Sequence, residues 1–429
     1  MSPRRLPSVV LPLAIAVAVG ALLLLSADAP PPEAVRLIFQ GALGSLGGIS
    51  STLMAWVPLV LASAGLVVTF AAGLWNIGVE GQIVMGAVSA TAVARLVPAP
   101  SGVVLPLMLL AGAAGGLLWG LLVGVLRVKG RVNEIFGGLG LDFVATGLVV
   151  YLVIGPWKRA GSASTSGTDL FPREAWLPST PSWVVSWVVV WAVLAAAFLV
   201  ALGVWRVWRH RQVRGVESPV RGPFLGRVST PWLVVGTVAL SGVVSGVGRV
   251  FGFPSEARLR TTGSLTASWV ALALAVAAVL LVYFLMRGTN FGLRLRAVGA
   301  NPRSAFLWGI STNRHLLGAF AICGALAGLG GALHASGFHH KLVPAVSGGY
   351  GFLGILVVLL AGFGARGIAP IALFFAVISV GSTQLQLRLQ LDSALGGVLQ
   401  GVLVLFTLLA GGWQLRRAHR SRHGSEEGG

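Results

Sequence analysis

The sequence has little charge and almost no cysteine. Only 10% of its 429 residues are charged, whereas 55% are hydrophobic; an ordinary soluble domain carries about 25% charged residues. So few polar groups cannot cover a water-facing surface of this size. The scarcity excludes a soluble globular protein and indicates that lipid covers most of the surface. Because Cys323 is the only cysteine, no disulfide can form within the chain.

Acidic residues and familiar catalytic motifs are scarce as well. The chain has 12 acidic residues against 31 basic ones. It contains no GxxxxGKS or GxxxxGKT phosphate loop, no HExxH zinc motif and no GxSxG nucleophile motif. We therefore expect no enzymatic activity in this chain, and the same scarcity argues against a membrane enzyme or a structural scaffold.

Apolar stretches long enough to cross a bilayer recur along the whole chain. About twelve are predicted, at 7–25, 51–74, 83–98, 102–126, 135–155, 183–205, 231–253, 267–286, 315–335, 347–363, 369–388 and 395–412. The third and the tenth are short, which is typical of broken or re-entrant helices inside a bundle. The sequence predicts an all-α, polytopic transmembrane helical bundle.

The first span has an alternative interpretation as a signal peptide. Arg4 and Arg5 precede it, and Ala27-Asp28-Ala29 resembles a cleavage site. Its apolar run is longer than the usual core of a signal peptide, which has 7–15 residues. We expect this span to be retained as a membrane helix.

The net charge of +19 would suggest a nucleic-acid partner in a soluble protein. Here the basic residues lie mostly between apolar stretches and in the tail, where they act as topology signals. With the N-terminus in the cytoplasm, the cytoplasmic segments collect most of them, including the groups at 127–131, 206–227 and 287–314. The bias predicts an even number of spans with both termini cytoplasmic.

One break in the apolar pattern lies at Gly73–Gln82. It places Asn76, Glu80 and Gln82 beside three glycines. An acid near the membrane is costly unless it is paired or faces water. The plain alternative is a turn with a solvated glutamate; the functional one is a broken helix that lines a polar pathway. Asp142 lies inside another span and needs a partner or water for the same reason.

A second glycine-rich break, Ser347–Phe352, begins a short span in the second half of the chain. Matching interruptions in two halves indicate an internal repeat with a site between them. Tyr350 and Phe352 are predicted as stacking partners for the solute. His334, His339 and His340 cluster nearby, but no cysteine or acid completes a metal site, and no metal is predicted.

The segment 288–310 is basic and predicted to be cytoplasmic. Pro302 after Asn301 is a helix start with an asparagine cap. The segment is either a charged loop that only sets topology or a short surface helix that docks into a partner subunit. The residues predicted to form the docking surface are Arg294, Arg296, Gly299, Asn301, Pro302 and Arg303.

Several of these segments resemble one known family. GLWNIGVEGQIVMGA, from residue 73, resembles the NIGxEGQ segment of the permease subunits of bacterial nucleoside and simple-sugar ABC importers, which are related to branched-chain amino acid permeases. GLRLRAVGANPRSAFLWGI, from residue 292, resembles their cytoplasmic coupling segment. GALAGLGGALHASG and GGYGFLGILVVLLAG resemble the segments that follow. The resemblance covers about 40–160 and 262–412.

The resemblance implies a permease subunit of an ABC importer in the bacterial cytoplasmic membrane, moving a nucleoside or similar small polar solute. It implies about ten core spans in two pseudo-symmetric halves. It also implies three partners: a cytoplasmic ATPase that holds ATP and Mg²⁺, a second permease subunit forming a heterodimer, and an extracytoplasmic solute-binding lipoprotein. The chain itself would carry no cofactor. The alternative is an ion-coupled secondary transporter acting without an ATPase, with Asp142 and Glu80 as candidate coupling groups.

The chain departs from the family pattern at two places. Residues 183–260 look like an inserted pair of spans joined by a basic cytoplasmic loop, and Asp142 stands where nucleoside-type members tend to have asparagine. The predicted organisation is therefore a first half (1–182), the insertion (183–260), a second half with the coupling segment (261–415) and a disordered cytoplasmic tail (416–429).

Overall fold

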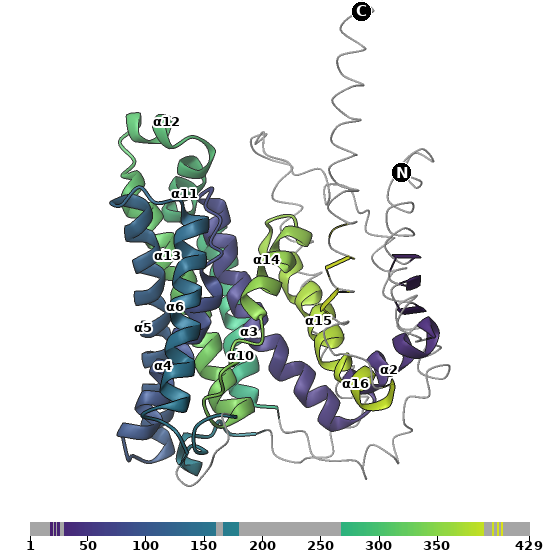
Figure 1. Cartoon of the computed structure of the whole chain (residues 1–429). Helices are drawn as coiled ribbons and strands as arrows, with labels where there is room; N and C mark the ends of the chain where they lie inside the picture. Colours follow the sequence, from purple (N-terminus) through teal and green to yellow (C-terminus); the bar gives the residue numbers. More distant parts are fainter. Residues whose placement is uncertain are drawn as a thin grey trace, which may run out of the picture.

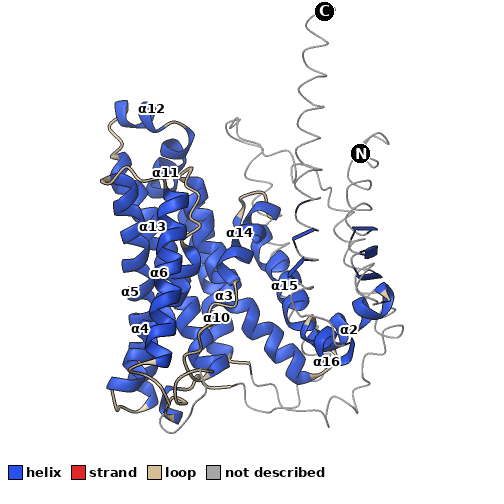
Figure 2. Ribbon diagram, in the orientation of Figure 1, coloured by secondary structure: helices blue, strands red, loops and turns tan. Residues whose placement is uncertain are grey.

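The computed structural model describes residues 30–159, 166–179 and 267–389, together with a few positions within 18–25 and 397–405. These residues are mainly helical, and their only extended pairing is an isolated bridge between Lys158 and Thr168 (Figure 2). The predicted spans at 183–205 and 231–253, most of those at 7–25 and 395–412, and the tail lie outside the described residues.

The described helices follow one another with short connections (Figure 1). They are α2 (Pro31–Leu43), α3 (Leu46–Ala71), α4 (Val79–Leu96), α5 (Ser101–Val128), α6 (Glu134–Ile154), the 3₁₀ turn η1 (Arg173–Ala175), α10 (Trp269–Gly288), α11 (Asn290–Ala300), α12 (Pro302–Leu307), α13 (Thr312–His334), the π-helical turn η2 (Ala335–His339), α14 (Tyr350–Leu360), α15 (Ala365–Gly381) and α16 (Thr383–Leu389). Side-chain caps fix four of the starts, those of α3, α6, α11 and α12. Ser45 accepts from Gly48 N at 3.0 Å, and Asn133 accepts from Ile135 N at 2.9 Å.

Six helices among the described residues are long and apolar enough to cross a membrane: α3, α5, α6, α10, α13 continued through η2, and α15 continued through α16. They coincide with predicted spans. The two spans predicted to be short are α4, with 18 residues, and α14, with 11 residues. Helix α2 was not predicted, because it is too short for a span. Pro31 and Pro32 lie in its first turn, where proline is compatible with the start of a helix.

Glycines bring α5 and α13 into backbone contact. Gly112, Gly116 and Gly120 of α5 face Gly324 and Gly328 of α13, and a Cβ at Gly116 or Gly328 would collide with the backbone of the opposite helix. Rising numbers on α5 meet falling numbers on α13, so the two helices are antiparallel. Close approach between small residues is a main source of helix association in lipid, and it accounts for the glycines on the facing sides of α5 and α13.

Helix α3 lies in the interior and α5, α6 and α10 at the surface. In the apolar stretch of α3, 83% of the residues are buried, whereas in each of the other three helices 28% of the residues are buried. Their exposed side chains are apolar, for example Leu118, Phe143 and Leu281. Exposed apolar helix faces of this kind suit lipid or another membrane subunit.

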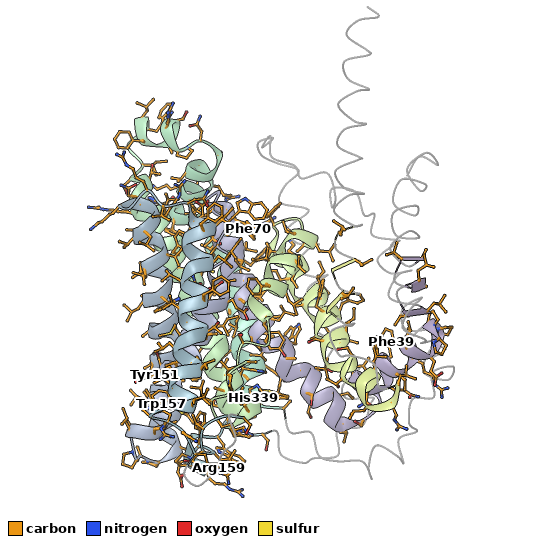
Figure 3. The ribbon with its side chains drawn as sticks, viewed as in Figure 1. Phe39, Phe70, Tyr151, Trp157, Arg159 and His339 are labelled. Atoms are coloured by element: carbon orange, nitrogen blue, oxygen red, sulfur yellow. The ribbon has the colours of Figure 1, made fainter. Side chains whose placement is uncertain are left out.

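The two ends of the bundle differ. Helices α11 and α12 project beyond one end (Figure 1). Trp157 and Arg159 lie at the opposite end, and His339 lies toward it, whereas Phe70 of α3 lies toward the α12 end (Figure 3).

Candidate functional site

The chain breaks between α3 and α4 and re-enters the bundle before α4 begins. Gly73, with φ +73°, allows the reversal after α3 ends. The non-helical stretch then carries Asn76 inward until its Nδ2 donates to Sγ of Cys323 at 3.1 Å. Cys323 lies near the middle of α13, so α4 starts inside the bundle and not at its surface. The predicted broken helix is confirmed.

Two amides hold the shape of this break. Asn76 Nδ2 donates to Oε1 of Gln82 at 3.2 Å, and Gln82 Nε2 donates to Oδ1 of Asn76 at 3.3 Å. Both side chains are fully buried. A reciprocal pair satisfies polar groups that would be costly to leave unpaired inside a protein. In this conformation the two amides tie the turn to the first turn of α4.

Glu80 joins α4 to the start of α14. Its Oε2 accepts from Gly351 N at 2.7 Å, and the Ser347 side chain with the backbone N–H groups of Gly349 and Phe352 surrounds the same carboxylate. Gly351 has no side chain, which lets its backbone approach Glu80 closely. A carboxylate at a helix N-terminus is stabilised by unpaired N–H groups and by the helix dipole.

Asp142 of α6 caps the N-terminus of α4 in the same way. Its Oδ1 accepts from Gly81 N, in the first turn of α4, at 2.7 Å. The two acids therefore form a series in which α6 caps α4 and α4 caps α14. Only 7% of Glu80 and 5% of Asp142 is exposed. The structure thus brings the two predicted acids together at the meeting point of two short helices, which we call the acid junction (Glu80, Asp142, Gly81 and Gly351).

One residue at the acid junction was missed from the sequence. Trp119 of α5 points its Nε1 toward Gly81, beside Asp142. Trp119 Nε1 and Asp142 Oδ2 are both buried without a hydrogen-bond partner in the described part of the chain. A lone tryptophan in a glycine-rich apolar helix was the available signal, because its indole N–H must find an acceptor when buried.

The aromatic residues of the second break separate. Tyr350 is buried edge-on to His334, with ring centroids 5.3 Å apart. Phe352 is exposed on α14. His334 also stacks on Phe338 at 5.0 Å and meets His339 edge-on at 4.7 Å. These histidines pack as aromatic rings, and no three His, Cys, Asp or Glu side chains of the described residues are placed to hold a metal ion.

The connection 166–179 covers this end of α13. Phe171 N donates to His340 O at 2.8 Å, and Thr168 N donates to Leu342 O at 2.9 Å. The backbone of His340 is in a left-handed conformation with φ +52°. Its ring stacks on the Trp176 ring, with the ring centroids 3.9 Å apart. The π-helical turn η2 and the following residues are thus fixed from outside by this connection.

At the opposite end, the predicted helix start in the basic segment is confirmed. Asn301 Oδ1 accepts from Arg303 N and Ser304 N, each at 3.1 Å, and Pro302 is the first residue of α12. Asn301 and Pro302 therefore shape the segment. Arg294, Arg296 and Arg303 are exposed on it, as a docking surface requires.

The tip of this segment, residues 306–308, is apolar and exposed to solvent. Phe306, Leu307 and Trp308 are 70%, 84% and 85% exposed. They lie within the segment predicted to dock, around Leu293 to Ile310, but were not among the residues named for its surface, because an apolar triplet in a membrane protein is easily attributed to packing. Their place directly after a basic, helix-capping stretch was the available signal.

Gly299 faces the chain's own bundle. It packs on the backbone of Ala71 and Ala72, and Gly73 packs on Gly299 in turn. Helix α11 therefore touches the turn from which the broken segment descends to Asn76. This contact connects the projecting segment to the acid junction through a few residues.

Comparison with known proteins gives the family. The model of the branched-chain amino acid transport system permease component matches residues 48–249 and 223–408. A glucose ABC transporter permease protein of Haloferax volcanii is 30% identical over 393 residues, covering 92% of this chain and 84% of the relative. A guanosine ABC transporter permease protein of Bacillus subtilis is 23% identical over 407 residues, covering 94% of each chain.

A nucleoside ABC transporter permease protein of Lactococcus lactis is 24% identical over 365 residues, covering 85% of this chain and 80% of the relative. No solved structure is significantly similar. The family model and these relatives agree with a membrane protein of several apolar spans. The chain belongs to this permease family and is a transmembrane permease subunit of an ABC importer of the nucleoside and simple-sugar type.

Proposed function

We propose that this subunit carries a nucleoside or a simple sugar across the cytoplasmic membrane through a pathway at the acid junction. The observation that carries the proposal is the meeting of two helix N-termini, each capped by an acid, inside the bundle. Broken helices meeting near the middle of a membrane are typical of solute sites in transporters. The relatives named for glucose, guanosine and nucleosides support this solute class.

The pathway residues are those that the sequence singled out: Asn76, Glu80, Gln82, Asp142, Tyr350 and Phe352. In the described conformation the first five are buried. Asn76 and Gln82 are paired with each other, Glu80 accepts from Gly351 N, and Asp142 accepts from Gly81 N. We expect that opening of the junction exchanges the Asn76–Gln82 amide pair for contacts with the solute. Because the amides are neutral and the exchange is between hydrogen bonds, its net free-energy cost is only about 1 kcal/mol per bond.

We place a cytoplasmic ATPase, which binds ATP and Mg²⁺, on α11 and α12. The exposed arginines Arg294, Arg296 and Arg303 offer charge, and Phe306, Leu307 and Trp308 offer an apolar anchor. Bare aromatic and aliphatic side chains that project from a surface are typical of binding hot spots. Basic residues at this end support its cytoplasmic orientation and, with it, cytoplasmic termini.

The remaining architecture is inferred from the resemblance to the family and from the sequence. We propose about ten core spans in two pseudo-symmetric halves, with 183–260 as an inserted pair of spans. A second permease subunit packs on the exposed apolar faces, and an extracytoplasmic solute-binding lipoprotein delivers solute at the end that carries the connection 166–179.

The experiment is uptake by proteoliposomes that contain this chain with its ATPase and second permease. We expect guanosine or glucose to accumulate only with ATP and the binding protein. Accumulation by this chain alone, driven by a proton or sodium gradient, would instead establish the ion-coupled alternative. The capping bonds of Glu80 and Asp142 argue against that alternative, because both carboxylates already serve helix N-termini.

A further inference from the structure

Two polar atoms at the acid junction are left without partners. Among the described residues, the indole N–H of Trp119 and Oδ2 of Asp142 are buried and unpaired. An unpaired buried group loses its bond to water and regains nothing, at a cost of about 1–3 kcal/mol, so each such group in a native protein calls for an explanation.

The Asp142 carboxylate and the Trp119 indole both pack closely against Gly81. A Cβ built on Gly81 would collide with them, 2.7 Å from Asp142 Oδ1 and 2.9 Å from Trp119 Nε1, so this close approach depends on the absence of a side chain at residue 81. Gly81 N is bonded to Asp142 Oδ1. Oδ2 of the same carboxylate and the indole N–H are therefore the groups left for a ligand that enters when the acid junction opens.

These two groups lie near the middle of the membrane. At 1.5 Å per residue, Trp119 is about 14 Å from the C-terminal end of α5 and Asp142 is about 12 Å from the start of α6. Both helices have those ends on the α12 side. The hydrocarbon core of a bilayer is about 30 Å thick, so the two groups are distant from either water phase.

The chemistry of the pair selects its ligand. The indole N–H can only donate, and Oδ2 of Asp142 offers an acceptor. An anion without a proton has nothing to donate to Oδ2, and an ammonium cannot accept from the indole. A hydroxyl is the smallest group that accepts and donates through a single atom.

We propose that Trp119 and Asp142 form a subsite that binds one hydroxyl of the sugar ring of the transported solute. This inference rests on the proposed function and narrows it to solutes with a free ring or ribose hydroxyl. Glucose and guanosine, which name two of the relatives, share that group although they differ elsewhere. Water has the same chemistry, and the experiment separates it from the solute.

The experiment compares Trp119→Phe with the wild type in the complete ATP-driven importer. The probes are guanosine with its 2′-, 3′- and 5′-deoxy analogues, and glucose with its monodeoxy series. Phenylalanine keeps an aromatic ring and removes the N–H. Trp269→Phe, at an exposed position on α10, is the matched control and should transport all probes as the wild type does.

We expect Trp119→Phe to lower kcat/KM for the parent solute about tenfold or more. One analogue lacks the hydroxyl that the pair binds. For that analogue the wild type should already have a low kcat/KM, and Trp119→Phe should lower it no further. Asp142→Asn keeps an oxygen that accepts from Gly81 N and replaces the second acceptor by a donor. We therefore expect it to lower kcat/KM for solutes that carry the same hydroxyl and not for the analogue that lacks it.

A loss that is equal for the parent and every analogue would overturn the inference, because the pair would then hold only a structural water. Unchanged transport in Trp119→Phe would overturn it as well. Neither result would touch the proposed function, which fails only if the wild-type importer moves no nucleoside and no sugar with ATP.

Discussion

Gly299 is the point at which the projecting segment can be disconnected from the acid junction by one methyl group. A Cβ at Gly299 would collide with the carbonyl oxygen of Ala71 and lie 2.9 Å from the carbonyl carbon of Ala72. These atoms are backbone and cannot rotate away. Gly299→Ala must therefore push α11 away from the turn at Gly73.

The magnitude follows from two opposing terms. Alanine favours the helix over glycine by about 1 kcal/mol, while overpacking against an immobile backbone costs about 1–3 kcal/mol. Gly288→Ala, at the end of α10, is the matched control, because nothing lies within 4 Å of a Cβ there. We expect the contact to be lost in Gly299→Ala and retained in the control.

The assay is solute taken up per ATP hydrolysed in proteoliposomes. We expect this ratio to fall several-fold in Gly299→Ala, with ATP hydrolysis continuing, and to stay at the wild-type value in Gly288→Ala. If both variants retain the wild-type ratio, the contact between α11 and the broken segment does not transmit the motion of the ATPase, and the reasoning is refuted.

Three further predictions concern the junction, the packing and the tip. Glu80→Ala leaves Gly351 N–H unpaired and should cost about 1–3 kcal/mol locally, seen as faster hydrogen exchange at the start of α14; Glu80→Gln, which keeps an acceptor, should lose less, and equal exchange in both would contradict the capping role. Gly116→Val should lower the melting temperature in detergent, because its side chain meets the backbone of α13; Gly140→Val, at an open position on α6, is the control and should melt as the wild type does. Trp308→Ala should weaken ATPase binding at least tenfold without changing the melting temperature; unaltered binding would place the ATPase elsewhere.

Much of the membrane architecture was predictable from the sequence. Long apolar runs are expected to span a membrane, and six described helices lie at predicted spans. The break at Asn76 was predictable because polar residues and glycines interrupt a span. The start of α12 was predictable because Asn301 and Pro302 are local signals.

The contacts between distant segments were not predictable. Nothing near Glu80 in the sequence indicates that its partner is Gly351, or that Asp142 caps Gly81; these bonds depend on how the helices pack. For the same reason Gly299 was assigned to a partner-facing surface, although it lies against Ala71 and Gly73. Trp119 drew no attention, because a buried tryptophan is ordinary until its N–H is seen to lack an acceptor.

The central claim is that the acid junction opens to solute during transport, and cysteine accessibility tests it most directly. Cys323→Ser keeps an acceptor for Asn76 and removes the only cysteine. In that background Ser347→Cys places one thiol beside Glu80. We predict that a membrane-impermeant thiol reagent labels it only while ATP is being hydrolysed, and that a transported nucleoside or sugar slows the labelling. Labelling that is indifferent to both ATP and solute would contradict the claim.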